Sequence, residues 1–208
     1  MEHIQGGSVA SQIRGLDEPL GDAIAARYAR QMVEALAFMH HRGIIHRDLK
    51  CDNILIQNGV LKITDFGTAK SVGTSTHSAQ TIVGTPYFMA PETLSMAFSD
   101  GSGGPQGYGS AVDVWALGIT VGEMINRGEP PWPQLSNLPS AFMYIGDAKA
   151  GNLPIVPPNG CAEFIRMCCV RDPKQRPTAK YLLQHSSWIQ NAGLPPGLDL
   201  PDITAEQV

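Results

Sequence analysis

Between residues 19 and 41, apolar side chains recur at steps of three and four, which is typical of a helix with one buried face. The side chains on that face are Ile24, Tyr28, Met32, Ala35, Leu36 and Met39. Pro19 suits the first turn and Gly43 the end, because proline fits the start of a helix and glycine the position just beyond it. The pattern therefore predicts one helix over 19–41.

A second helix is predicted over 111–126, where apolar residues fall on nearly every side. They are Val112, Val114, Trp115, Leu117, Ile119, Val121, Met124 and Ile125. A helix that is apolar all round belongs at the centre of a core. The prolines within 130–133 are expected to stop it, and further helices are predicted over 161–170 and 178–190.

Two short β-like runs flank the pair Asn58-Gly59, one over 53–56 and one over 61–64. Asn-Gly between apolar runs is the strongest short-range signal for a β-hairpin. Such a hairpin places Asn53 and Asp65 at its open end, so we expect these two side chains to face one spot.

In three segments the hydrophobic residues show no periodic pattern. Residues 68–84 are rich in serine, threonine and glycine and are expected to form a mobile loop. Residues 98–110 are rich in glycine and are expected to be a flexible insertion. The glycine- and proline-rich end of the chain after Trp188 is expected to be a loose tail.

Composition narrows the class of protein. With 208 residues, 43% of them apolar and 16% charged, the chain can bury one sizeable core. A net charge of −4, without any lysine or arginine run, argues against a nucleic-acid surface. The sequence begins with no signal-peptide pattern, and no stretch is long and apolar enough for a membrane span. We therefore expect a cytoplasmic protein, or a fragment of one.

The four cysteines are Cys51, Cys161, Cys168 and Cys169. They form no C-x-x-C pair and no zinc spacing, which indicates free thiols in a reducing compartment. Cys168 and Cys169 end an apolar helical stretch, so we expect them to pack in a core rather than to perform redox chemistry.

The chemistry of the chain is concentrated in His46–Asn53, here called the 46–53 loop, and in Asp65–Gly67. Asp48, Asn53 and Asp65 offer two carboxylates and a carboxamide that can share Mg²⁺, beside Lys50, as phosphoryl transfer requires. Five fixed positions at roughly one in twenty each match by chance about once in three million windows. The alternative interpretation is an ordinary loop with solvated charges and a helix cap.

With these motifs the chain resembles the large lobe of eukaryotic serine/threonine protein kinases, from residue 1 to about 190. The further motifs that carry the resemblance are Gly84–Glu92, which ends in Ala-Pro-Glu, Asp113–Gly118 and Arg171–Thr178. The resemblance implies a mainly α fold, a helical bundle with short β-hairpins. It also implies a kinase domain over 1–190, made of the interlobe hinge and the C-terminal lobe, and a flexible tail over 191–208.

The same resemblance implies a role for each residue of the site. Asp48 would orient the substrate hydroxyl and accept its proton, and Lys50 would lie against the γ-phosphate of ATP. Asn53 and Asp65 would hold Mg²⁺. Thr85 would bridge Asp48 and Lys50. A lysine at position 50 also marks a preference for serine and threonine over tyrosine.

Regulation is implied by Arg47, which would pair with a phosphate on the activation loop. Thr81 has the spacing of the primary phosphorylated threonine. Ser75, Thr76 and Ser78 are weaker candidates, and the alternative is that all four are ordinary loop hydroxyls. Glu92 is expected to form a structural ion pair with Arg176.

For the nucleotide, the resemblance implies that Met1–Ile4 is the hinge. The carbonyl of Glu2 and the amide of Ile4 would meet adenine, with Leu55 and Thr64 lining it from below. No G-x-G-x-x-G loop and no V-A-x-K lysine is found, so we expect the small N-terminal lobe to be missing. These 208 residues alone are then expected to bind ATP weakly and to phosphorylate almost nothing.

Within the kinases the chain looks most like the MAP kinase kinase kinase group. That likeness implies ATP-dependent phosphorylation of serine or threonine in a protein substrate, possibly a MAP kinase kinase. Two alternatives are a truncated or pseudokinase module that binds partners without catalysis, and an unrelated phosphate-binding module.

Overall fold

The computed structural model describes residues 6–71, 85–96, 109–132, 135, 137–147, 151–156 and 158–192. Its α-helices are α1 (Val9–Arg14), α2 (Asp22–His41), α3 (Pro91–Met96), α4 (Ala111–Ile125), α5 (Leu138–Gly146), α6 (Cys161–Cys168), α7 (Ala179–His185) and α8 (Ser187–Gln190). Its strands are β1 (Ile44–Ile45), β2 (Ile54–Gln57), β3 (Val60–Ile63) and β4 (Lys70–Ser71). The described residues also form the 3₁₀ turns η1 (Cys51–Asn53), η2 (Phe66–Thr68) and η3 (Pro86–Phe88). The expected mainly α fold with short β-hairpins is confirmed.

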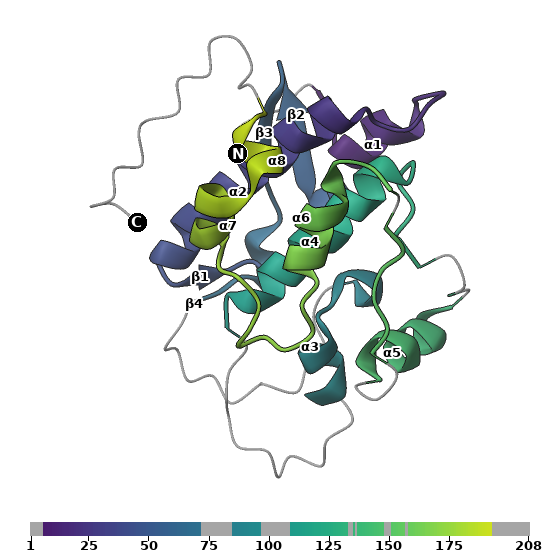
Figure 1. The fold of residues 1–208 in the computed structure, drawn as a ribbon, viewed down its shortest axis with the longest axis vertical. Coiled ribbons are helices and arrows are strands. Elements are labelled where there is room, and N and C mark those ends of the chain that lie inside the picture. The colour runs from purple at the N-terminus through teal and green to yellow at the C-terminus, as the bar shows by residue number, and fades with distance from the viewer. Residues whose placement is uncertain are drawn as a thin grey trace.

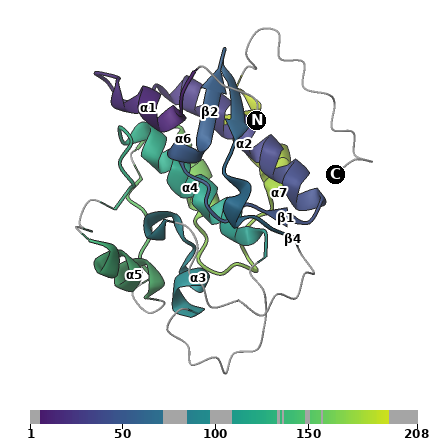
Figure 2. The same ribbon diagram turned by 180° about the vertical axis from the view of Figure 1, so that it is seen from behind.

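Helix α4 is the centre of the molecule, as its sequence predicted. Every residue from Val112 to Ile125 is buried. Figures 1 and 2 show α4 in the middle of the structure, with the β2–β3 hairpin at one end and α3 and α5 at the other. Helix α4 ends at Ile125, and Arg127 and Gly128 then turn the chain with φ of 59° and 85°. The chain thus leaves the helix before it reaches the prolines that were expected to stop it.

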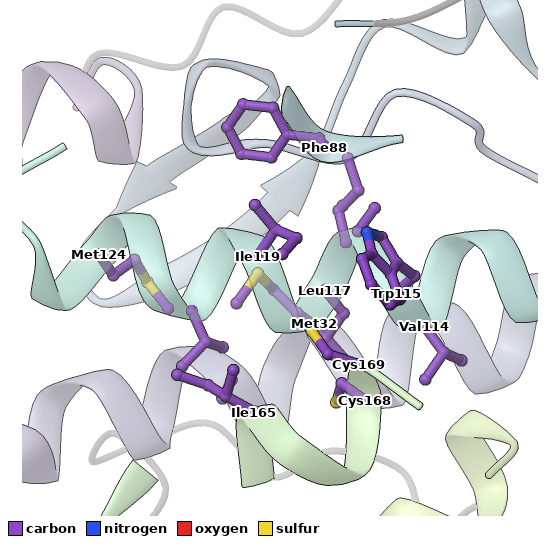
Figure 3. Packing of buried hydrophobic residues seen from close by; sticks show 14 of the residues in the cluster. Met32, Phe88, Val114, Trp115, Leu117, Ile119, Met124, Ile165, Cys168 and Cys169 are labelled. Carbon is purple, nitrogen blue, oxygen red and sulfur yellow. The ribbon is translucent and has the colours of Figure 1, made fainter. Parts of the chain in front are cut away.

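Helix α6 packs closely against α4, and Cys168 at its end and Cys169 just after it lie in the contact (Figure 3). A Cβ atom added to Gly118 would lie 2.6 Å from Cys168 Cβ and 2.8 Å from Cys169 Sγ. Glycine is therefore required for this close approach of the two helices. Both thiols are free and buried, so the expectation that they pack in the core is confirmed.

Helix α2 begins at Asp22, later than predicted, and ends at His41 as predicted. The predicted buried face is right for Met32, Leu36 and Met39, but Ile24 is 43% exposed. In this part of α2 the buried residues are instead three alanines, Ala25, Ala26 and Ala29. Several helices, among them α4 and α7, contact α2, and a stripe of alanines is a weak signal in a sequence.

The predicted hairpin is confirmed. Strands β2 and β3 pair antiparallel, with Ile54 opposite Ile63 and Gln57 opposite Val60. Asn58 and Gly59 have φ of 54° and 79°, as the tight hairpin turn requires. Gln31 of α2 holds the turn through two hydrogen bonds, because its Nε2 donates to Gly59 O (3.0 Å) and its Oε1 accepts from Leu61 N (2.9 Å).

Other expectations for the secondary structure are partly wrong. The predicted helix over 178–190 is divided at Ser186 into α7 and α8. The predicted loop over 68–84 includes, near its start, the end of η2 and strand β4, which pairs antiparallel with β1. Helices α1, α3 and α5 were not predicted; each has fewer than ten residues, too short for a clear period. Residues 72–84, 97–108 and 193–208 lie outside the described residues.

Candidate active site

The 46–53 loop is held from behind by Asp113, in the first turn of α4. One carboxylate oxygen of Asp113 accepts from His46 N (2.9 Å) and from His40 Nε2 (2.8 Å), and the other from Arg47 N (2.8 Å). Asp113 is completely buried, and a buried carboxylate requires such donors. Arg47 has φ of 71°, which is unusual for a residue other than glycine. Asp113 thus fixes the loop where its backbone is strained.

Asp48 is the centre of a cluster of polar side chains. Its Oδ1 accepts from Thr85 N (3.1 Å) and lies 3.3 Å from Thr85 Oγ1. Its Oδ2 accepts from Asn53 Nδ2 (2.9 Å) and lies 3.1 Å from Lys50 Nζ. Both oxygens are therefore engaged, and Asp48 is held in one orientation.

Lys50 and Thr85 complete this cluster. Lys50 Nζ donates to Thr85 Oγ1 at 2.7 Å, so the ammonium group lies between the Thr85 hydroxyl and the Asp48 carboxylate. Thr85 immediately precedes η3 and is far from the 46–53 loop in the sequence. The structure thus brings together Asp48, Lys50, Asn53 and Thr85, the four residues expected to be catalytic.

Asn53 and Asp65 follow from the hairpin. Asn53 O accepts from Thr64 N (2.9 Å) and from Thr64 Oγ1 (3.1 Å), so Asn53 faces the residue before Asp65. Asp65 is exposed, in a left-handed conformation with φ of 61°, and its Oδ1 accepts from Gly67 N at 3.4 Å. The Asn53 amide nitrogen is used on Asp48, which makes the amide oxygen the atom suited to a cation.

These donors fit a magnesium–nucleotide complex better than an isolated metal ion. Mg²⁺ prefers oxygen ligands, keeps several waters, and is usually bound by one or two carboxylates together with phosphates. Asp65 and Asn53 offer one carboxylate and one amide oxygen. Among the described residues, no group of three or more His, Cys, Asp or Glu side chains could hold a metal ion by itself.

The segment around Asp65 is tied to the 46–53 loop by His46 and Arg47. The His46 ring meets Phe66 edge to face, with 5.4 Å between ring centroids, and its Nε2 lies 2.9 Å from Thr64 O. Thr68 Oγ1 donates to His46 O (2.9 Å), and Arg47 Nε donates to Thr68 O. Half of Phe66 is exposed.

The remaining predicted site residues lie around this cluster or outside the described residues. Leu55 is half-buried and forms a bridge with Ser8, and Thr64 is half-buried on Asn53. Glu2, Ile4 and Thr81 lie outside the described residues. The expected ion pair of Glu92 with Arg176 is confirmed.

Sequence reasoning gave no role to three polar side chains of α4, namely Asp113, Thr120 and Glu123. Thr120 Oγ1 lies 3.3 Å from Leu49 O and 2.7 Å from Ala116 O, and Glu123 accepts from Cys51 N at 2.9 Å. The available signal was their presence in a helix that is otherwise apolar. Buried polar groups are hydrogen-bonded, but the sequence does not show to which partner.

Comparison with known proteins agrees with this geometry. Residues 1–189 match the family model described as "Protein kinase domain". Mitogen-activated protein kinase kinase kinase 19 from Homo sapiens is 35% identical over 196 residues, which cover 89% of this chain and 14% of that protein. Mitogen-activated protein kinase kinase kinase A from Dictyostelium discoideum is 35% identical over 208 residues, 98% of this chain and 20% of that protein.

A third relative is mitogen-activated protein kinase kinase kinase nsy-1 from Caenorhabditis elegans, which is 36% identical over 187 residues, 88% of this chain and 12% of that protein. The chain thus spans a fifth or less of the length of these relatives. Within the described residues, no helix combines the length and the apolar character needed to cross a membrane. The family match shows that the chain belongs to the protein kinase domain family, and over most of its length the chain is similar in sequence to these mitogen-activated protein kinase kinase kinases.

Proposed function

We propose that the cluster around Asp48 transfers the γ-phosphate of ATP to serine or threonine hydroxyls of a protein substrate. The observation that carries the proposal is the set of contacts that joins Asp48, Lys50 and Thr85. Asp48 Oδ1 meets Thr85, and Lys50 Nζ lies 3.1 Å from Asp48 Oδ2 and 2.7 Å from Thr85 Oγ1. A carboxylate held in this way beside a fixed cation is arranged for phosphoryl transfer.

In this mechanism Asp48 orients the substrate hydroxyl and accepts its proton as the new oxygen–phosphorus bond forms. The bond between the γ-phosphorus and the bridging oxygen of ADP breaks. Lys50 neutralises the charge that shifts onto the phosphoryl oxygens. The proton moves late, so the orientation of Asp48 matters more than its basicity.

Asn53 and Asp65 are the residues that would hold Mg²⁺, which neutralises phosphate charge when it is bound. Leu55 and Thr64 would line one side of the adenine. Glu2 and Ile4 would meet the adenine edge through their backbone, and Arg47 would pair with a phosphate on Thr81. The sequence motifs support these assignments, and the hairpin also supports those of Asn53 and Asp65, because it holds Asn53 against Thr64, the residue before Asp65.

The relatives suggest the place of this activity. Their printed names are those of mitogen-activated protein kinase kinase kinases. We therefore propose a role in a MAP kinase cascade, with a MAP kinase kinase as the protein substrate. The four free and buried cysteines support a cytoplasmic location. We expect the 208 residues alone to bind ATP weakly and to phosphorylate almost nothing.

The test is magnesium-dependent nucleotide binding and phosphate transfer by the 208-residue chain and by two variants. Asp65→Asn should remove most of the magnesium dependence of ATP binding. Asp48→Asn should abolish transfer while ATP binding is retained. Asp52→Asn is the matched control, because Asp52 lies on the same loop but is exposed and pairs with Arg14. Measurable transfer that is equal in all four proteins, or magnesium-dependent ATP binding that Asp65→Asn leaves unchanged, would overturn the proposal and favour a non-catalytic, partner-binding module.

A further inference from the structure

Helix α4 has three polar side chains on an otherwise apolar surface, and all three are buried. Asp113, Thr120 and Glu123 stand on successive parts of the helix and face the 46–53 loop. Burying a polar group costs free energy unless it is hydrogen-bonded. The burial of Asp113 is explained by its hydrogen bonds to the backbone of the 46–53 loop. The burial of Glu123 still requires an explanation, because Glu123 has no part in the proposed transfer step.

Glu123 is 2% exposed, and its Oε2 accepts a 2.9 Å hydrogen bond from Cys51 N. Cys51 begins the turn η1, and Lys50 before it makes no side-chain bond to that turn. The N–H of Cys51 therefore receives its partner from α4, a distant part of the chain. A bond between an N–H and a carboxylate is about twice as strong as one between neutral groups.

The position of this bond connects it with the proposed site. Cys51 is the residue after Lys50, and the turn continues with Asn53 N donating to Lys50 O at 3.0 Å. We propose that Glu123 is a positioning residue, whose carboxylate holds the backbone N–H of Cys51 and thereby sets Lys50 and Asn53 relative to each other. The link to catalysis rests on the proposed function, but the hold on the loop can be measured without nucleotide.

The electrostatic surroundings make this hold depend on pH. Burial raises the pKa of Glu123 from its ordinary value of 4.5 to about 7, although hydrogen bonds from Cys51 lower it. Asp52 on η1 raises the pKa further and Arg14 on α1 lowers it. Both charge states are thus populated near neutral pH. Because the ionised form is the stronger acceptor, the hold on Cys51 should tighten as pH rises through about 7.

This local effect has the opposite sign to the effect on the whole fold. A carboxyl group with a raised pKa makes the folded state less stable as pH rises, because the folded state then has to bury a charge. Tightening at Cys51 and weakening of the fold are therefore separable. If Glu123 only stabilises the fold, the protection of the Cys51 amide should instead fall with rising pH together with the free energy of unfolding.

The experiment measures hydrogen exchange at the Cys51 amide by NMR, in the 208-residue chain without nucleotide, between about pH 5.5 and 8.5. We expect the protection factor, corrected for intrinsic exchange, to rise about tenfold across this range. Glu123→Gln should retain protection at the level seen at low pH, without the rise. Glu123→Ala should lose protection at every pH. Glu129→Gln, an exposed acid just after α4, should behave like the unchanged chain.

Two results would overturn the proposal: protection that falls with pH together with global stability, or a rise that persists in Glu123→Gln. The glutamine variant alone decides the question if the alanine variant does not fold. As a second readout, Glu123→Ala should weaken Mg-ATP binding about tenfold, and Glu123→Gln should restore part of it. Absence of Mg-ATP binding by the unchanged chain would contradict the proposed function, and the exchange result would then decide the role of Glu123 by itself.

Discussion

The Arg176 guanidinium holds the Glu92 carboxylate through two parallel hydrogen bonds, with Nη1 to Oε1 at 2.7 Å and Nη2 to Oε2 at 3.0 Å. The Arg176 side chain is fully buried and that of Glu92 is 20% exposed. Arg176 also donates to Ala111 O (2.7 Å) and Val170 O (2.8 Å). The pair thus connects α3 with the start of α4 and with the loop after α6.

Glu92→Ala should therefore lower the free energy of unfolding by about 3 kcal/mol, because it leaves a buried guanidinium without its carboxylate. Urea unfolding followed by circular dichroism measures this. Glu163→Ala, an exposed acid on α6, is the control and should change stability by less than about 0.5 kcal/mol. Equal effects of the two substitutions would show that the Glu92–Arg176 pair does not contribute to the free energy of unfolding.

Thr85→Val should reduce phosphate transfer about 10- to 100-fold, because it removes the hydroxyl that contacts both Lys50 and Asp48 while it retains the shape of the side chain. Thr85→Ser retains the hydroxyl and should keep most of the activity. The readout is the initial rate of transfer from labelled ATP at saturating nucleotide. Full activity of the valine variant would show that the Thr85 hydroxyl does not contribute to phosphate transfer.

The raised pKa of Glu123, about 7 against an ordinary 4.5, predicts how stability depends on pH. Its contribution should be most favourable below about pH 4.5 and should be lost as pH rises to about 7. The loss amounts to at most about 3 kcal/mol, because the pKa of Glu123 rises from 4.5 to about 7 in the folded state. Glu123→Gln cannot ionise, so its stability relative to the unchanged chain should increase between about pH 5 and 8.

Urea unfolding of both proteins at several pH values measures this difference, and the comparison cancels the titration of the other carboxylates. Glu129→Gln should show no such trend. A constant difference between the unchanged chain and Glu123→Gln at all pH values would mean that Glu123 ionises normally in the folded state.

Gly118→Ala should destabilise the protein by about 1–3 kcal/mol, because the added Cβ would lie 2.6 Å from Cys168 Cβ and 2.8 Å from Cys169 Sγ. The cost reflects overpacking, since alanine by itself favours a helix more than glycine does. Gly109→Ala meets nothing within 4 Å and serves as the control. Thermal unfolding of the two variants separates the prediction from a general effect of alanine.

Local patterns in the sequence determined several features of this protein. The Asn58-Gly59 turn fixed the hairpin, because few dipeptides fit two residues with positive φ. The apolar run of α4 identified the central helix, and the 46–53 loop identified the chemistry. In each case the information lies within a few residues of the feature, where backbone sterics and hydrophobic periodicity act directly.

The tertiary structure alone decided which distant groups meet. Periodicity placed Ile24 on the buried face of α2, but the folded chain buries Ala25, Ala26 and Ala29 and leaves Ile24 exposed. Asp113 and Glu123 were visible as acids in an apolar helix, yet their partners, the backbone N–H groups of the 46–53 loop, precede them by 66 to 72 residues. Such contacts arise from the packing of whole helices, for which sequence spacing carries no direct signal.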